Sequence, residues 1–133
     1  MFLSPLLQPH ATCRLVNRRN GKVVAHDLSV AIDSASRRKG LLGRDSMVQG
    51  SAIVIAPTNA IHTWFMRFDI DVAFVTKDGR ILKIRHRLRP WRVFASMRAF
   101  AAIELPAGAL ESSGTESGDT LVVVDSGSMG QRQ

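Results

Sequence analysis

Two acidic residues, Asp71 and Glu104, stand in otherwise apolar segments of the chain. An ionised carboxylate is very costly to bury alone, so each must be paired, hydrogen-bonded or placed at the edge of a pocket. If the two converge near His62, which can titrate near neutrality, the three could perform acid–base catalysis. The simpler alternative is structural: each acid accepts backbone amides or pairs with Arg44 or Arg67.

The segment from Arg80 to Arg92 is rich in cations. Side chains alternate along a strand, so apolar residues and His86 would share one face and a row of cations the other. The row would be about 20 Å long and could bind an anionic ligand or polymer. The alternative is a solvated face that discourages strand-to-strand aggregation. Trp91 is the one aromatic residue beside the row, so nucleic acid, whose bases stack on aromatic side chains, ranks low among such partners. The predicted anion-binding residues are Lys83, Arg85, Arg87 and Arg89.

The segment Ile61-His62-Thr63-Trp64-Phe65-Met66 is expected to be a central strand, because large side chains would occupy both of its faces. Trp64 is therefore expected in the core rather than on a contact surface. A shallow pocket is predicted near this strand. Its candidate ligand-binding residues are Arg44, His62, Trp64, Asp71 and Glu104.

The sequence contains no known motif for a metal, nucleotide or hydrolase site. The four histidines, at positions 10, 26, 62 and 86, show no metal-binding spacing. The single cysteine, Cys13, excludes an internal disulfide and a multi-cysteine zinc site. Nucleotide-binding, hydrolase and metalloprotease motifs are also missing. The sequence therefore predicts no metal and no cofactor, and it assigns no catalytic residue.

The elements that must position these residues are mostly short strands. Asn20-Gly21 and Asp78-Gly79 each stand between apolar runs and predict tight hairpins. A helix is expected from Asp33 to Gly43 and a helical turn from Ala107 to Ser112. The prediction is a mainly β fold, sandwich or barrel-like, with about eight short strands and one or two short helices.

The chain is expected to form one domain over residues 12–125, with a flexible lead-in over 1–11 and a disordered tail over 126–133. Its net charge of +7 favours anionic partners. The first residues lack a basic n-region, and Pro5 and Pro9 interrupt the apolar stretch, which favours a cytoplasmic location. No apolar run has the length of a membrane span.

Five short pieces follow one another along the chain: Gly40-Leu41-Leu42-Gly43-Arg44, His62-Thr63-Trp64-Phe65-Met66-Arg67, Ile70-Asp71-Val72-Ala73-Phe74, Ile103-Glu104-Leu105-Pro106-Ala107-Gly108 and Gly118-Asp119. In this order they resemble the bacterial and archaeal domain-of-unknown-function family 192. The resemblance covers about residues 23–124 and implies a mostly β, sandwich-like fold with no established activity. Members of that family are often exported, which points away from the cytoplasm.

Three hypotheses follow for the function. The first is a non-enzymatic binding or accessory module with a basic strand facing an anionic partner. The second is a small hydrolase-type enzyme that uses Asp71 and Glu104 with His62. The third is a structural protein-interaction module, which predicts an exposed apolar patch instead of a pocket.

Overall fold

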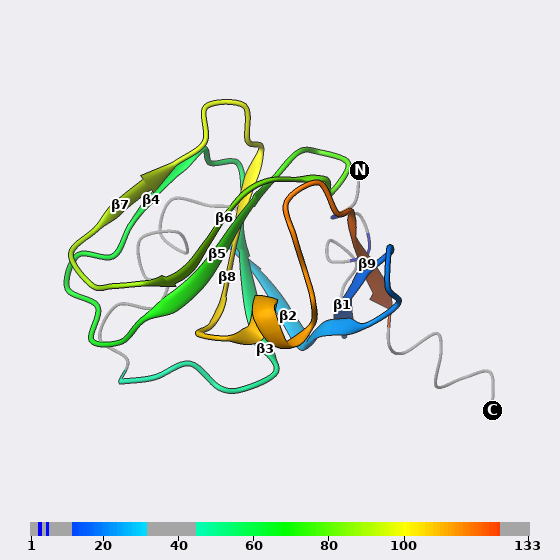
Figure 1. Cartoon of the computed structure of the whole chain (residues 1–133), viewed down its shortest axis with the longest axis horizontal. Helices are drawn as coiled ribbons and strands as arrows, with labels where there is room; N and C mark the ends of the chain where they lie inside the picture. Colours follow the sequence, from blue (N-terminus) through cyan, green and yellow to red (C-terminus); the bar gives the residue numbers. More distant parts are fainter. Residues whose placement is uncertain (1–2, 4, 6–11, 32–44, 126–133) are drawn as a thin grey trace.

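The computed structural model describes residues 3, 5, 12–31 and 45–125, and these form a mainly β domain (Figure 1). Its elements are β1 (Cys13–Asn17), β2 (Val23–Ala31), β3 (Ser51–Ile55), β4 (Ala60–His62), β5 (Ile70–Val75), β6 (Ile81–Leu88), β7 (Val93–Ala95), β8 (Ala101–Pro106), α2 (Ala109–Ser112) and β9 (Leu121–Asp125). The predicted mainly β class is confirmed.

Seven strands form one sheet in the order β6-β5-β8-β3-β2-β1-β9, and β4 pairs with β7 in a separate two-stranded sheet. Among the strands that the structure describes, only β2 and β3 pair in parallel, and the other pairs are antiparallel. The large sheet curls until its outer strands meet at one end, where Arg80 bridges Thr120. Backbone bonds of 2.8 Å also join Ile81 to Gly118 and to Asp119. The sheet is therefore a partly closed barrel, as the barrel-like prediction requires.

Both predicted hairpins are present. Gly21 lies between β1 and β2 with φ of 72°, and Gly79 lies between β5 and β6 with φ of 87°. Glycine reaches this left-handed region without a steric penalty, so both sequences suit their turns. The helical turn expected near Ala107 is also confirmed, as the short helix α2.

The barrel sheet carries an apolar core on each of its faces. The first apolar core fills the inside of the curl and takes residues from all seven of its strands. The second lies on the opposite face of β5 and β8, where β4 and β7 cover it. Because side chains alternate along a strand, neighbouring residues of β5 and β8 enter different cores. This alternation decides which candidate side chains can meet.

The central strand expected from Ile61 to Met66 is wrong in extent, because β4 ends at His62 and pairs with β7, a strand that was not predicted. The expected helix from Asp33 to Gly43 lies outside the described residues, as do the tail and most of the lead-in. Leu3, within the lead-in, is buried in the first core.

Candidate functional site

The tryptophan motif forms a turn rather than a strand. The amide of Met66 donates to the carbonyl of Thr63 at 3.2 Å, which makes Trp64 and Phe65 the two central turn residues. Thr63 and Met66 are buried, whereas Trp64 is 46% exposed and Phe65 67% exposed. The expectation that Trp64 belongs to the core is therefore wrong, because the alternation of an extended strand ends where the turn begins.

Thr63 ties this turn to the loop between β6 and β7. Its hydroxyl donates to the carbonyl of Arg89 at 2.6 Å and accepts from the amide of Arg92 at 2.9 Å. Its own backbone bonds to Arg92 and Trp91, at 2.8 and 3.0 Å. One fully buried threonine thus fixes two loops side by side, at the end of the molecule remote from β1 and β9 (Figure 1).

The two loops display aromatic side chains to solvent. The rings of Phe65 and Trp91 lie 4.7 Å apart, and the rings of His62 and Trp64 lie 4.8 Å apart. Val93 pairs with His62 across β4 and β7, and both are exposed. We call these residues the aromatic patch: His62, Trp64, Phe65, Trp91 and Val93.

Two residues of the aromatic patch hold a strained backbone. Phe65 has φ of 66° and Trp91 has φ of 64°, in the left-handed region where bulky residues are rare. Such a conformation costs about 1–3 kcal/mol for each residue and tends to persist at functional sites. Neither ring is buried, so core packing does not account for the strain. The sequence missed this feature because a left-handed turn normally shows as Gly or Asn, and Phe65 carries no such signal.

The predicted cation row does not lie on one face. Val72 pairs with Arg85 and Ile70 pairs with Leu88, so β6 carries one extra residue between these pairs. Arg87, inside this irregularity, has φ of 50°. A bulge of this kind reverses the alternation, because the extra residue shifts every later side chain to the other face. Lys83 and Arg85 therefore share a face, but Arg87 and Arg89 do not continue it, although all four are exposed.

Two of these cations already have partners. The Lys83 ammonium donates to the carbonyl of Ala95 at 2.8 Å and lies 4.7 Å from the ring centroid of Phe94. Arg87 lies 3.4 Å from Glu111 in an exposed ion pair. Arg85 and Arg89 form no side-chain bond that involves the described residues, so these two remain available to a partner.

Asp71 is a structural clamp. The residue is fully buried, and its carboxylate accepts from the amide of Arg87 at 3.0 Å and from the amides of Gly108 and Leu110 at 3.1 Å each. These three donors belong to the bulge in β6 and to the start of α2. The carboxylate thus replaces strand bonds that the bulge removes and satisfies free amides at a helix start.

Glu104 points away from Asp71. Asp71 pairs with Leu105, a residue of the first core, whereas Glu104 pairs with Val72, a residue of the second. The two carboxylates therefore lie on opposite faces of the sheet, so the condition for the acid–base alternative, that they converge, is not met. Glu104 is 4% exposed, and burial raises its pKa from 4.5 to about 7.

His62 and Arg44 are the other predicted ligand-binding residues. His62 is exposed, and its Nδ1 accepts the amide of Trp64 at 3.3 Å. Arg44 lies outside the described residues. Cys13 is buried in β1, where burial and the charge of Asp125 raise the pKa of its thiol, so it is a poor nucleophile. Within the described ranges, no three His, Cys, Asp or Glu side chains gather in a metal-binding group.

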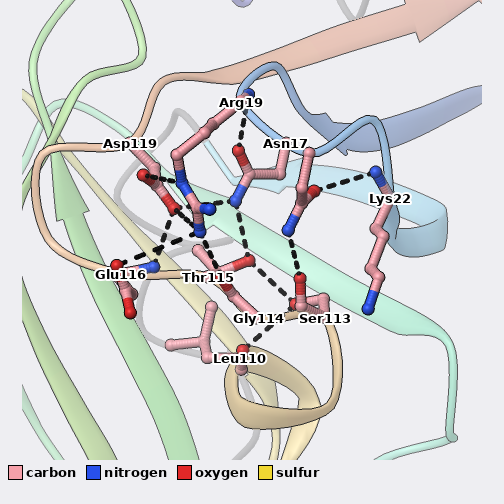
Figure 2. Close-up of polar contacts among 10 residues, drawn as sticks. Asn17, Arg19, Lys22, Leu110, Ser113, Gly114, Thr115, Glu116 and Asp119 are labelled. Atoms are coloured by element: carbon pink, nitrogen blue, oxygen red, sulfur yellow. Dashed lines mark hydrogen bonds and ion pairs between the residues drawn. The ribbon is translucent and has the colours of Figure 1, made fainter.

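A separate polar cluster surrounds Asp119, in the segment before β9 (Figure 2). Asp119 accepts from Arg19 at 2.7 and 3.1 Å, from Asn17 at 2.9 Å and from the amide of Glu116 at 2.9 Å. These bonds, with the Arg19 guanidinium first, hold the pKa of Asp119 well below its ordinary value of 3.8. Every oxygen of the Asp119 carboxylate is used, so this cluster joins the β1–β2 turn to the segment before β9 and is structural.

Comparison with known proteins identifies a family and a relative of this chain. The profile of family DUF192, described as Uncharacterized ACR, matches residues 15–123. A UPF0127 protein of Thermococcus sibiricus (strain DSM 12597 / MM 739) is 29% identical over 113 residues, which cover 80% of this chain and 72% of that protein. The resemblance predicted from the five sequence pieces is confirmed.

Two solved structures share the fold. One, from Sinorhizobium meliloti 1021 and provisionally described as a transcription regulator, has a TM-score of 0.70 and 24% identity, and the match covers 82% of this chain and 89% of that one. The other, a protein of unknown function from Novosphingobium aromaticivorans DSM 12444, has a TM-score of 0.70 and 19% identity, with 82% and 81% covered. At these identities the likeness concerns the fold alone. Among the described residues no helix is long and apolar enough to span a membrane.

Proposed function

Since the chain belongs to the DUF192 family, whose description names no activity, we propose from its own geometry that it is a non-catalytic binding module. The aromatic patch is its contact surface, and its partner is anionic. The observation that carries this proposal is the pair Phe65 and Trp91, both exposed, in mutual contact and held in a left-handed backbone.

Stability alone does not account for this pair. Two strained residues cost about 1–3 kcal/mol each, and an exposed ring returns little of that through burial. The Thr63 clamp nevertheless holds both loops in place. Contiguous exposed aromatic surface on a folded domain marks an interaction site. On binding, a Trp or Phe side chain covers roughly 150–250 Å² and commonly dominates the energy of an interface.

The charge around the aromatic patch favours an anionic partner. Arg92 follows Trp91 in the sequence and Arg89 lies two residues before it, and both are exposed. Arg67 follows the turn with a side chain 65% exposed, but it is paired with Asp45 at 2.9 Å. The whole chain carries a net charge of +7. Cations at the border of an interface mainly raise the association rate, and their effect weakens as salt is added. These exposed cations support an anionic contact at the loops rather than along β6, where the bulge divides the predicted row.

The test measures binding to three anionic probes: vesicles containing phosphatidylserine, poly-glutamate and single-stranded oligonucleotide. Measurements at about 50 mM and about 300 mM salt separate the charged contribution. We expect one probe to bind at low salt, to shift the fluorescence of the exposed tryptophans and to release as salt rises. The probe that binds identifies the class of partner.

Two variants separate binding from folding. Phe65→Gly and Trp91→Gly remove a ring and relieve the left-handed strain, so each should weaken binding while leaving the stability unchanged or higher. Met97→Ser is the matched control, because Met97 is 85% exposed but lies on the loop between β7 and β8, outside the aromatic patch. The proposal is wrong if no probe binds at low salt, or if Met97→Ser weakens binding as much as Trp91→Gly.

A further inference from the structure

The aromatic patch lies on two loops that are fixed to each other. Trp64 and Phe65 are the central residues of the turn after β4, and Trp91 lies on the loop between β6 and β7. The buried Thr63 joins the two loops through its hydroxyl and its backbone. Both loops lie at the end of the molecule remote from β1 and β9 (Figure 1). The exposed rings are therefore presented on a backbone that is held in place before a partner binds.

The exposed aromatic surface is small for a protein–protein interface. Trp64 is 46% exposed, Phe65 67% and Trp91 56%. At about 150–250 Å² for a whole side chain, the three rings together present roughly 250–420 Å². A stable protein interface buries about 800 Å² on each partner, with complementary shapes over that area. A bilayer surface is fluid and accepts single side chains, so a patch of this size fits a bilayer better than a folded partner.

The chemistry of the rings also favours the boundary between water and lipid. A tryptophan ring is apolar but carries one N–H donor, and tryptophan is enriched at membrane–water interfaces. Nucleic acid bases, by contrast, stack on the faces of aromatic side chains. In the aromatic patch each ring already contacts another, Phe65 with Trp91 at 4.7 Å and His62 with Trp64 at 4.8 Å. Shallow insertion into a bilayer keeps these pairs together, whereas stacked bases compete with them for ring surface.

The segments around the aromatic patch carry cations without acids. Residues 46–68 and 79–103 include β3, β4, β6, β7 and the aromatic patch, and they hold eight Lys or Arg and no Asp or Glu. The rest of the chain holds 10 Lys or Arg against 11 Asp or Glu, so the positive charge is concentrated in these segments. Arg89 and Arg92, on the same loop as Trp91, are both exposed. Anionic lipid attracts such cations, with a strength that weakens as salt is added.

We propose that the anionic partner of the aromatic patch is the surface of a bilayer that contains anionic lipid, an inference that rests on the function proposed above. Trp64, Phe65 and Trp91 insert their rings at the level of the lipid headgroups, about 5–10 Å deep. Arg89 and Arg92 attract the anionic headgroups beside the rings. The barrel itself remains outside the lipid.

Intrinsic fluorescence reports this contact directly, because Trp64 and Trp91 are the two tryptophans of the chain and the chain has no tyrosine. The probes are vesicles of phosphatidylcholine alone and vesicles in which roughly a third of the lipid is phosphatidylserine, with and without bromine on the acyl chains. Sedimentation of the vesicles measures binding. At low salt we expect the phosphatidylserine vesicles to bind at least about tenfold more tightly than the neutral ones. They should shift the tryptophan emission to the blue and, when brominated, quench it.

Two variants separate the inserted rings from the charge. Phe65→Gly keeps both tryptophans, relieves the positive φ and removes one ring, so it should weaken vesicle binding about tenfold while the melting temperature is maintained or raised. Arg89→Gln should weaken binding to the phosphatidylserine vesicles about fivefold, the effect of one cation near an anionic surface. Arg18→Gln is the matched control, because Arg18 is exposed on the turn after β1, remote from the aromatic patch. It should change binding by less than about twofold.

Failure of this inference and failure of the proposed function give different results. If poly-glutamate or the oligonucleotide binds at low salt and the vesicles do not, the aromatic patch is a binding site but its partner is not a bilayer. If the vesicles bind but brominated chains do not quench the tryptophans, the rings do not insert and the inference is wrong. It is also wrong if Arg18→Gln weakens binding as much as Arg89→Gln. If no probe binds at low salt, the proposed function fails together with it.

Discussion

Replacing Asp71 with asparagine tests the clamp that holds the bulge in β6 against α2. One oxygen of the carboxylate, Oδ2, accepts the amides of Gly108 and Leu110, and the other, Oδ1, accepts the amide of Arg87. An asparagine has one oxygen. With that oxygen toward α2, its NH₂ group faces the amide of Arg87, and two donors then oppose each other.

The size of the effect follows from these three bonds. Leaving the part-buried amide of Arg87 without an acceptor costs about 1–3 kcal/mol. The other two bonds survive but lose the charge of the acceptor, which contributes roughly half of their strength. We therefore expect Asp71→Asn to lower the free energy of unfolding by about 3 kcal/mol. For a chain of this length the melting temperature should fall by about 10 °C.

Urea unfolding followed by far-UV circular dichroism measures this free energy, and a constant m value shows that the unfolded state has not changed. Glu111→Gln is the control, because it breaks the exposed ion pair with Arg87 at 3.4 Å and should cost less than about 1 kcal/mol. If Asp71→Asn costs no more than this control, the clamp does not contribute as the geometry requires, and a role in chemistry regains support.

Two further predictions concern the threonine clamp and Asp119. Thr63→Val keeps the shape of the side chain but leaves the carbonyl of Arg89 and the amide of Arg92 without their hydroxyl partner. Urea titrations should therefore show a free energy of unfolding lower by about 1–3 kcal/mol, and binding through the aromatic patch should weaken. Thr63→Ser keeps the hydroxyl and should preserve binding. Asp119 has a pKa lowered by folding, so its contribution to stability is complete above about pH 4 and is lost as the pH falls below the unfolded value of 3.8. The stability difference between wild type and Asp119→Asn should therefore shrink as the pH falls from about 6 to about 2.5 in urea titrations, and a constant difference would contradict the assigned role of the carboxylate.

Local sequence signals determined the hairpins. Asn20-Gly21 and Asp78-Gly79 produce tight turns because glycine reaches positive φ at no steric cost, a property that neighbouring residues hardly alter. The apolar runs on either side have strand periodicity and became β1, β2, β5 and β6. For the same reason the mainly β class could be predicted from the sequence.

The exposed turn that carries Trp64 and Phe65 could not be predicted in this way. A short extended run ending in Trp64 has the same pattern whether it is a central strand or a strand that ends in an exposed turn. The buried hydroxyl of Thr63 selects the turn, because it bonds to Arg89 and Arg92, which lie 26 and 29 residues away in the sequence. Local periodicity contains no information about such a bond.

The sequence by itself identified the two unusual acids, the family pattern that contains both of them, and the cations of β6. Only the tertiary structure decided what these residues can do together. One extra residue in β6 divides the cations between the two faces of the sheet. Glu104 pairs with Val72, the residue after Asp71 on β5, so the two acids point to opposite faces. Both outcomes depend on the register between β5, β6 and β8, which long-range backbone pairing sets. As a result Asp71 has three backbone partners, whereas Glu104 has none among the described residues.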